Sequence, residues 1–285
     1  MTDRAHILER KAQWRHRLML APALIFLAAM FIVPLAGIVS RSFFTQQFTF
    51  GNYLEIFGDD IYFLVIARTF RIATIVTVIC VIIGYPTAYV LTHAPSRIAR
   101  LLMIAVVVPY FSSVIVRTYA WMVLLGKEGV INQQLLALGF SRADLLYNET
   151  GVLIGMTYVL LPFMILSLFT VMRGIDQGLM RAGHILGASR FYAFRRIFLP
   201  LSLPGLAGGM MLVFILAVGF YITPALMGGP GDVTIAMLIQ REVEITVNWS
   251  FASALATVLL FVTLIVFAFY SRFIHLDRLF GMKHR

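Results

Sequence analysis

Six apolar stretches, each long enough to cross a lipid bilayer, are the feature that most constrains how this chain can fold. A membrane-spanning helix needs about 20 mainly apolar residues. The stretches lie at 18–39, 66–91, 99–125, 151–172, 200–224 and 251–272. Inside a bilayer each backbone polar group needs a protein partner, which an α-helix supplies within its own segment. The sequence therefore predicts an all-α, polytopic membrane protein with six transmembrane helices in one domain over residues 1–285.

The composition supports lipid as the surrounding solvent. Hydrophobic residues make up 60% of the chain and charged residues only 13%, against about 25% charged residues in soluble domains. The net charge of +10 does not indicate nucleic-acid binding, because the basic residues flank apolar stretches and do not form one patch. Cys80 is the single cysteine and lies in an apolar stretch, so the chain cannot form an internal disulfide or a cysteine-based metal site.

The sign of the charge alternates from one connecting segment to the next. Basic residues outnumber acidic ones in the segments 1–17, 92–98, 173–199 and 272–285. Acidic residues outnumber basic ones in the segments 41–65, 126–150 and 225–250. Lys and Arg mark the cytoplasmic side of a membrane. We therefore expect a protein of the bacterial inner membrane with both termini in the cytoplasm, which requires an even number of spans.

The segment 173–199 is the most informative connection. Asp176 is placed to cap one short helix, and Ser189 a second, because both side chains accept hydrogen bonds from helix N-termini. Gly187 interrupts the two helices, and Pro200 suits the first turn of the following span. One face of the first helix is expected to carry Leu179, Met180, Ala182, Gly183 and Leu186.

Two interpretations of this segment are open. It could lie on the membrane with Arg190, Arg195 and Arg196 at the lipid headgroups. It could instead insert into a groove on a soluble partner, which the small residues favour because they permit close backbone approach. Those small residues are Ala182, Gly183, Gly187 and Ala188.

The pattern G-A-S-x-x-x-x-F-x-x-I-x-L-P-x-x-x-P-G, from Gly187 to Gly205, resembles the signature loop of ABC importer permeases. The resemblance implies the type I importer permease fold, with 173–199 as the loop that docks on a separate ATP-binding cassette ATPase. It also implies two ATPase copies, a second homologous permease and a periplasmic solute-binding protein. The implied coupling residues are Asp176, Arg181, Ala182, Gly183, Gly187, Ala188, Ser189 and Pro200. Arg181 stands where the family usually has glutamate, which changes the charge offered to the ATPase.

Other stretches resemble the spermidine/putrescine branch of these permeases. They include Gly84-Tyr85-Pro86, Val108-Pro109-Tyr110 with Arg117 and Tyr119, and Tyr158 with Leu161 and Pro162. This resemblance implies transport of a polyamine or a similar small solute. Bends are expected at the prolines of the spans, Pro34, Pro86, Pro109, Pro162 and Pro224.

Motifs for chemistry on this chain are missing from the sequence. Gly126-Lys127-Glu128 lacks the spacing and the hydroxyl residue of a phosphate-binding loop. We find no carboxylate pair, histidine cluster or Gly-x-Ser-x-Gly turn, so we expect no catalytic residue, metal site or cofactor. A membrane enzyme is disfavoured. A secondary transporter or channel working alone would carry midplane ionisable groups or internal repeats, and neither is visible.

Four residues are candidates for the solute path: Tyr110, Arg117, Tyr158 and Tyr221. Aromatic faces attract cations, although helix packing or a belt at the membrane interface explains aromatic residues equally well. No Asp or Glu lies in the middle of a span. Arg117 maps towards the periplasmic end of its span, where its side chain could extend to the interface.

The predicted topology can be tested by labelling. Cysteine introduced at Asp59, Leu145 or Asp232 should react with a membrane-impermeant maleimide added outside intact cells, because these positions follow an odd number of crossings. A cysteine at Arg190 should react only after the membrane is permeabilised. Protection of all three outer positions would refute the six-span topology.

Overall fold

The computed structural model describes residues 2–44 and 47–273, with side chains for residues 21–272 within these ranges. Apart from an isolated bridge between Phe44 and Phe48, the described residues form helices and connecting loops, which confirms the all-α prediction. The long helices are α1 Thr2–Arg41, α3 Asp60–His93, α7 Glu149–Arg173, α10 Leu199–Val218 and α13 Trp249–Phe273. The shorter helices are α2 Gly51–Gly58, α4 Ser96–Val107, α5 Val114–Leu125, α6 Val130–Ala137, α8 Gln177–Ile185, α9 Arg190–Ala193, α11 Ile222–Met227 and α12 Ile235–Glu244.

The third predicted span, 99–125, is broken. Among the described residues, five helices are long and apolar enough to cross a membrane, and the number is six if the segments Ser96–Phe111 and Val114–Ala137, bent by 106°, count as one span. Pro109 lies in a short 3₁₀ turn, Val108–Phe111, and the backbone at Ser112 is extended. Because proline has no amide hydrogen to donate and the turn is followed by extended backbone, the span bends sharply just after Pro109, where a bend is expected.

The fifth span also ends earlier than predicted. Helix α10 stops at Val218, with Gly219 at its C-terminus, and the chain re-forms a short helix, α11, only at Ile222. Pro34, Pro86 and Pro162 lie inside α1, α3 and α7, so proline does not interrupt these three helices.

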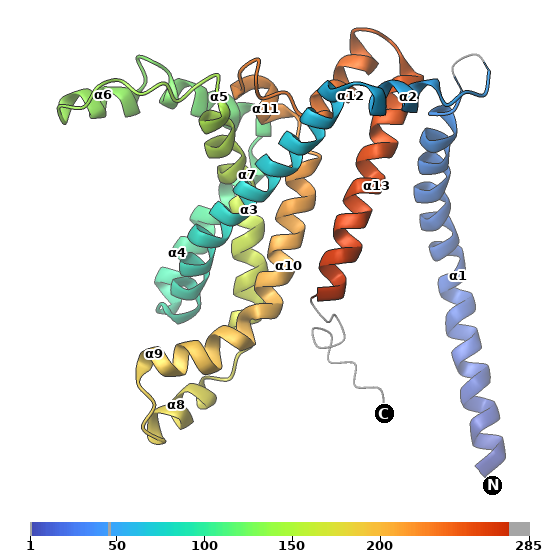
Figure 1. The fold of residues 1–285 in the computed structure, drawn as a ribbon. Coiled ribbons are helices and arrows are strands. Elements are labelled where there is room, and N and C mark those ends of the chain that lie inside the picture. The colour runs from blue at the N-terminus through green and yellow to red at the C-terminus, as the bar shows by residue number, and fades with distance from the viewer. Residues whose placement is uncertain (1, 45–46, 274–285) are drawn as a thin grey trace.

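The two ends of the described chain lie on the same side of the bundle as the connection between α7 and α10. Figure 1 shows the start of α1, the end of α13 and the pair α8–α9 at the bottom, and α2, α6, α11 and α12 at the top. This arrangement agrees with an even number of crossings. The predicted basic tail with Arg278, Lys283 and Arg285 lies outside the described residues.

The core of the bundle is formed by α3, α7 and α10, which pack against one another. Glycines allow the helices to approach closely. A Cβ added at Gly84 would lie 2.8 Å from Met164 Cγ, and one added at Gly205 would lie 2.8 Å from Val171 Cβ. The Ser167 hydroxyl donates a hydrogen bond to the Gly205 carbonyl at 2.9 Å. Small residues with an interhelical hydroxyl are typical of helix contacts in membranes.

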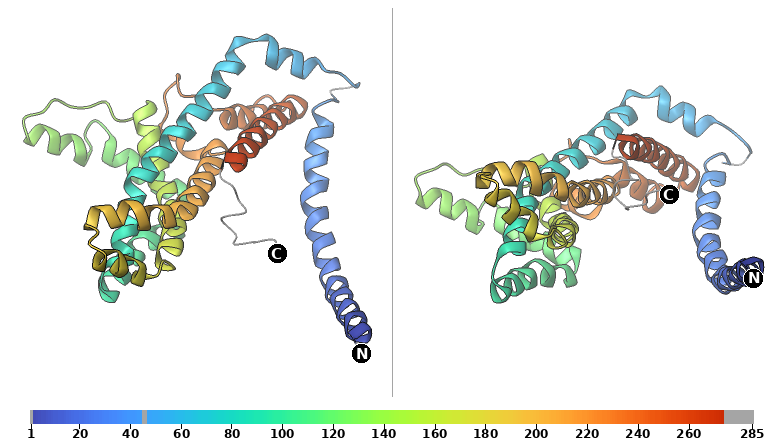
Figure 2. Two further views of the ribbon diagram at one scale, coloured as in Figure 1. Left: turned by 60° about the horizontal axis from the view of Figure 1, so that its bottom comes forward. Right: turned by 90° about the horizontal axis from the view of Figure 1, so that it is seen from below.

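A second cluster joins α13 to the outer helices α2 and α12. Ile56, Phe251 and Leu255 are buried in it, and the rings of Tyr62 and Phe251 meet edge to face at 5.5 Å. Helix α1 stands apart from the core in both views of Figure 2, with α13 as its neighbour. Large apolar side chains of α1, such as Phe31, remain exposed, so this surface is available to lipid or to another subunit.

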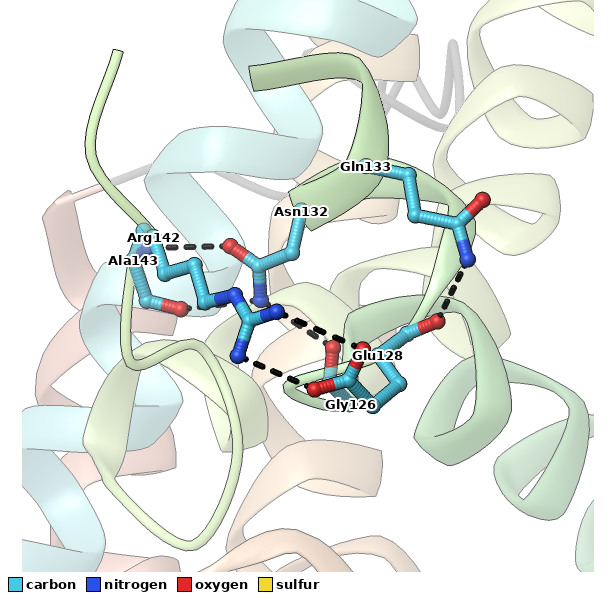
Figure 3. Close-up of polar contacts among 6 residues, drawn as sticks. All are labelled: Gly126, Glu128, Asn132, Gln133, Arg142 and Ala143. Atoms are coloured by element: carbon cyan, nitrogen blue, oxygen red, sulfur yellow. Dashed lines mark hydrogen bonds and ion pairs between the residues drawn. The ribbon is translucent and has the colours of Figure 1, made fainter. Parts of the chain in front are cut away.

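One buried asparagine organises the outer loop between α5 and α7 (Figure 3). Asn132 is fully buried. Its amide donates to the carbonyls of Gly126 at 3.0 Å and Ala143 at 3.1 Å, and its side-chain oxygen accepts from Ala143 N at 2.8 Å. An exposed ion pair, Arg142–Glu128 at 2.9 Å, closes the same loop. The loop that carries α6 is therefore held by its own hydrogen bonds.

The close contact of α10 with α7 predicts the effect of a single methyl group. Gly205→Ala should destabilise the folded protein by about 1–3 kcal/mol, because the new Cβ overpacks against Val171 and backbone must shift. Gly37→Ala in α1 is the control, since an added Cβ there meets nothing within 4 Å. Unfolding of both variants in detergent measures the difference, and equal midpoints would contradict the packing described here.

Candidate functional site

The loop between α7 and α10 folds into the two short helices that the sequence predicts, and both caps are confirmed. Asp176 Oδ1 accepts from Gly178 N at 2.7 Å, and Ser189 Oγ accepts from Tyr192 N at 3.2 Å. Gly187 separates the helices with φ of +86°. This left-handed conformation lets Ala188 N donate to the carbonyl of Gly183 at 3.0 Å, so the turn depends on a residue without a Cβ.

The residues predicted to share one face of α8 are buried to different degrees. Gly183 is buried, and a Cβ there would lie 2.9 Å from Ile197 Cδ1. Met180 also packs towards the core. Leu186, however, is 87% exposed, because the chain has already turned towards Gly187. Leu179 and Ala182 are exposed too, so only Met180 and Gly183 of the five predicted residues pack against the rest of the chain.

The tip of the loop is an uncovered apolar surface with basic residues around it. Its large side chains are exposed by 56–87% and are Ile185, Leu186, Phe191 and Tyr192. Arg181, Arg190 and Arg195 are also exposed, and the Arg196 guanidinium lies 6.0 Å from the Tyr192 ring centroid. Figure 1 shows the pair α8–α9 projecting from the bottom of the bundle. The arrangement suits contact with another surface.

A group of aromatic residues ties this loop to the bundle, and the sequence analysis missed it. The chain runs from α9 through a π-helical turn, Phe194–Phe198, directly into α10. The Tyr89 ring on α3 meets Phe194 at 5.6 Å and Phe198 at 5.1 Å, and the Tyr85 and Ser202 hydroxyls are 2.8 Å apart. The signal was present, since aromatic residues recur four positions apart in both helices.

The second candidate region is the junction of α5, α7 and α11. The hydroxyls of Thr118 and Thr223 are 3.2 Å apart, and the Trp121 and Tyr158 rings meet at 5.3 Å. Close approach of α11 to α7 requires Gly155, where a Cβ would lie 2.6 Å from Thr223 Cγ2. Arg117 precedes Trp121 by one turn of α5, so it belongs to the same junction.

The predicted path tyrosines are only partly brought together. Tyr158 lies in the junction, and Tyr221 immediately precedes α11. Tyr110 lies in the turn after α4, where its ring meets Phe163 at 5.3 Å. Among the described residues, no hydrogen bond or ring contact joins the three tyrosines to one another. The role of each as a path residue stays a prediction.

Arg117 does not extend to the membrane interface as expected. The residue is only 7% exposed, and its Nε is buried without a hydrogen-bond partner in the described part of the chain. Arg71 behaves differently, since its side chain is 57% exposed and forms an ion pair with Glu149. From the sequence, Arg117 was placed near the periplasmic end of its span. Its burial was missed, because it results from the packing of α5 against other helices.

The described residues contain no group of three or more His, Cys, Asp or Glu that could hold a metal ion. Cys80 is a free, buried thiol on α3.

Comparisons with known proteins show which family the chain resembles. Residues 80–278 match the family described as "Binding-protein-dependent transport system inner membrane component". The chain is 34% identical over 262 residues to the spermidine/putrescine transport system permease protein PotB of Haemophilus influenzae, covering 90% of this chain and 89% of that protein. It is 30% identical to the inner membrane ABC transporter permease protein YdcU of Escherichia coli, covering 80% and 77%.

Two solved structures share the fold. A chain of a bacterial alginate ABC transporter, in complex with its pentasaccharide-bound periplasmic protein, superposes with a TM-score of 0.76 at 20% identity. The match covers 97% of this chain and 98% of that one. A chain of an inward-facing MetNI methionine ABC transporter superposes with a TM-score of 0.57 at 18% identity, and the match covers 73% of this chain and 92% of that one.

The turn between α8 and α9 can be tested on the isolated protein. Gly187→Val should cost about 1–2 kcal/mol in this turn, because an L-residue is strained at positive φ. No clash is involved, since nothing lies within 4 Å of an added Cβ. Gly187→Asn is the matched control, because asparagine tolerates this conformation. Trypsin should cleave at Arg181 and Arg190 faster in the valine variant only, and equal cleavage of both variants would contradict the turn geometry.

Proposed function

The chain belongs to the family of binding-protein-dependent transport system inner membrane components, and on this premise we propose that its solute is a polyamine. It is a multi-pass permease subunit of an ABC importer in the inner membrane, and ATP hydrolysis takes place on a separate subunit. The observation that carries the polyamine proposal is the 34% identity to PotB, a spermidine/putrescine permease, over nearly the whole of both chains.

The proposed assembly contains two ATPase subunits, a second homologous permease and a periplasmic binding protein. The exposed apolar tip formed by Ile185, Leu186, Phe191 and Tyr192 supports docking of the ATPase, because such a patch is stabilised when a partner covers it. Arg181 is exposed beside this tip. Since it takes the place of the family's usual acid, the docking surface should offer it a carboxylate or carbonyl oxygens.

The proposed mechanism is alternating access, with the cytoplasm on the side of α8 and α9. The π-helical turn Phe194–Phe198 joins the docking loop to α10 without a flexible linker, and its rings pack on Tyr89 of α3. A displacement of the loop by the ATPase would therefore reach two core helices as a rigid movement. The bend at Ser112–Ser113 and the break at Gly219–Tyr221 divide the neighbouring spans into parts that could move separately.

Polyamine recognition would use aromatic faces and acids from another subunit. Trp121 and Tyr158 supply aromatic faces at the junction of α5, α7 and α11. The middle of the described spans contains no Asp or Glu, so the carboxylates that pair with a polyamine's ammonium groups would come from the second permease.

The proposal is tested by reconstitution. Proteoliposomes that contain the chain, the second permease and the ATPase should take up labelled putrescine. Uptake should require ATP and the binding protein, with the binding protein on the outside. The Gly187→Val variant should lower binding-protein-stimulated ATP hydrolysis, while Gly187→Asn keeps it. Uptake by this chain alone, driven by an ion gradient, would favour a secondary transporter, and ATP-dependent uptake of another solute only would refute the polyamine assignment.

A further inference from the structure

Arg117 is a buried cation for which the described chain provides no anion. It is 7% exposed and its Nε is fully covered without an acceptor. It takes part in neither of the ion pairs of the described residues, which are Arg71–Glu149 and Arg142–Glu128. Helix α5 itself, Val114–Leu125, contains no acidic residue.

Arginine cannot avoid this cost by losing its proton. Its guanidinium stays charged at every physiological pH. An unpaired charge inside a protein or a membrane is costly, and such residues pair with other groups or mark a functional site. The structure of the single chain therefore leaves one charge uncompensated at the junction where the proposed path lies.

The surroundings of Arg117 indicate where the compensating group enters. The opposite side of α5 is uncovered, with Val116 62% exposed, Tyr119 53% and Val123 72%. Arg117 lies on the other face of the helix, so an incoming group can reach it only at the 7% of the residue that stays exposed. Because Nε is covered, an incoming group meets the two terminal nitrogens, which present a planar pair of donors that matches a carboxylate.

We propose that Arg117 is a carboxylate-binding residue whose carboxylate comes from outside this chain, either from the second permease or from the solute. The inference rests on the proposed importer assembly. With a polyamine as solute, the second permease is the source, and pairing also removes the repulsion between Arg117 and a cationic solute. With a solute that carries a carboxylate, Arg117 would bind it directly.

The experiment uses the complete transporter in nanodiscs with the variants Arg117→Lys, Arg117→Gln and Arg117→His. Recovery of the second permease by an affinity tag on this chain reports assembly, and binding-protein-stimulated ATP hydrolysis reports coupling. Arg117→Gln should lower at least one readout tenfold or more, and Arg117→Lys, which keeps the charge but loses the planar pair of donors, should lie between Arg117→Gln and the unchanged protein. Arg68→Gln is the control, because Arg68 is a partly exposed arginine of another span and should change neither readout.

The histidine variant separates charge from packing. Its imidazole titrates near pH 6.5 when unperturbed, and a neighbouring carboxylate shifts the pKa upward. The readout lost in Arg117→Gln should therefore be low in Arg117→His at pH 8 and recover as the pH falls to 5.5, relative to the unchanged complex. If Arg117→Gln matches the unchanged protein, or if Arg117→His shows no recovery at low pH, the inference is overturned and Arg117 is a packing residue.

Two further measurements identify the source of the carboxylate. The first is a charge swap between the subunits. If Arg117→Glu abolishes assembly, and replacing one acidic residue of the second permease by arginine restores it, the carboxylate belongs to that subunit. The second is stimulation of ATP hydrolysis by a solute. If succinate but not putrescine stimulates the unchanged complex, and Arg117→Gln assembles but loses this stimulation, the carboxylate belongs to the solute. The latter result refutes the polyamine proposal while the inference on Arg117 stands, so the two failures are distinguishable.

Discussion

The contact of α7 with α3 and α10 is the interaction on which the other features depend. In lipid there is no hydrophobic force between apolar helices, so close packing and interhelical hydrogen bonds must hold them together. Gly84 and Gly205 let the backbones approach Met164 and Val171, and Ser167 adds a hydrogen bond to the Gly205 carbonyl. Two regions are attached to this three-helix core. One is the loop between α7 and α10, residues 174–198, called the inner loop below, and the other is the junction of α5, α7 and α11.

Continuous helix and ring contacts connect this core to the loop between α7 and α10, whereas several outward-facing surfaces are uncovered. The π-helical turn and the Tyr89, Phe194 and Phe198 rings join α8 and α9 to the core. The apolar tip of the loop, the side of α5 and most of α1 are exposed in the single chain. The proposed docking of a partner on the tip would therefore act on a loop that is joined to the core by these contacts.

Much of the fold could be predicted from the length of the apolar stretches. The helix caps of the inner loop could be predicted from the residue types at those positions. Asp176, Gly187 and Ser189 act through local backbone geometry, which depends on neighbouring residues only. The bend at Pro109 could be predicted from the proline, but its size of 106° could not. The burial of Arg117 could not be predicted either, because it depends on how α5 packs on α7 and α11. The spacing of the aromatic residues puts each pair on one face of its own helix, but it does not indicate that the two faces meet, because Tyr89 and Phe198 are more than a hundred positions apart.

Hydrogen exchange of the inner loop, with and without the ATPase subunits, tests the central claim most directly. If the loop docks on the ATPase and transmits its movement to α10, amides of residues 177–198 should exchange more slowly in the complex, while those of α6 should not change. Unchanged exchange in 177–198, in a complex shown to be assembled, would mean that the ATPase contacts another surface and would contradict the account.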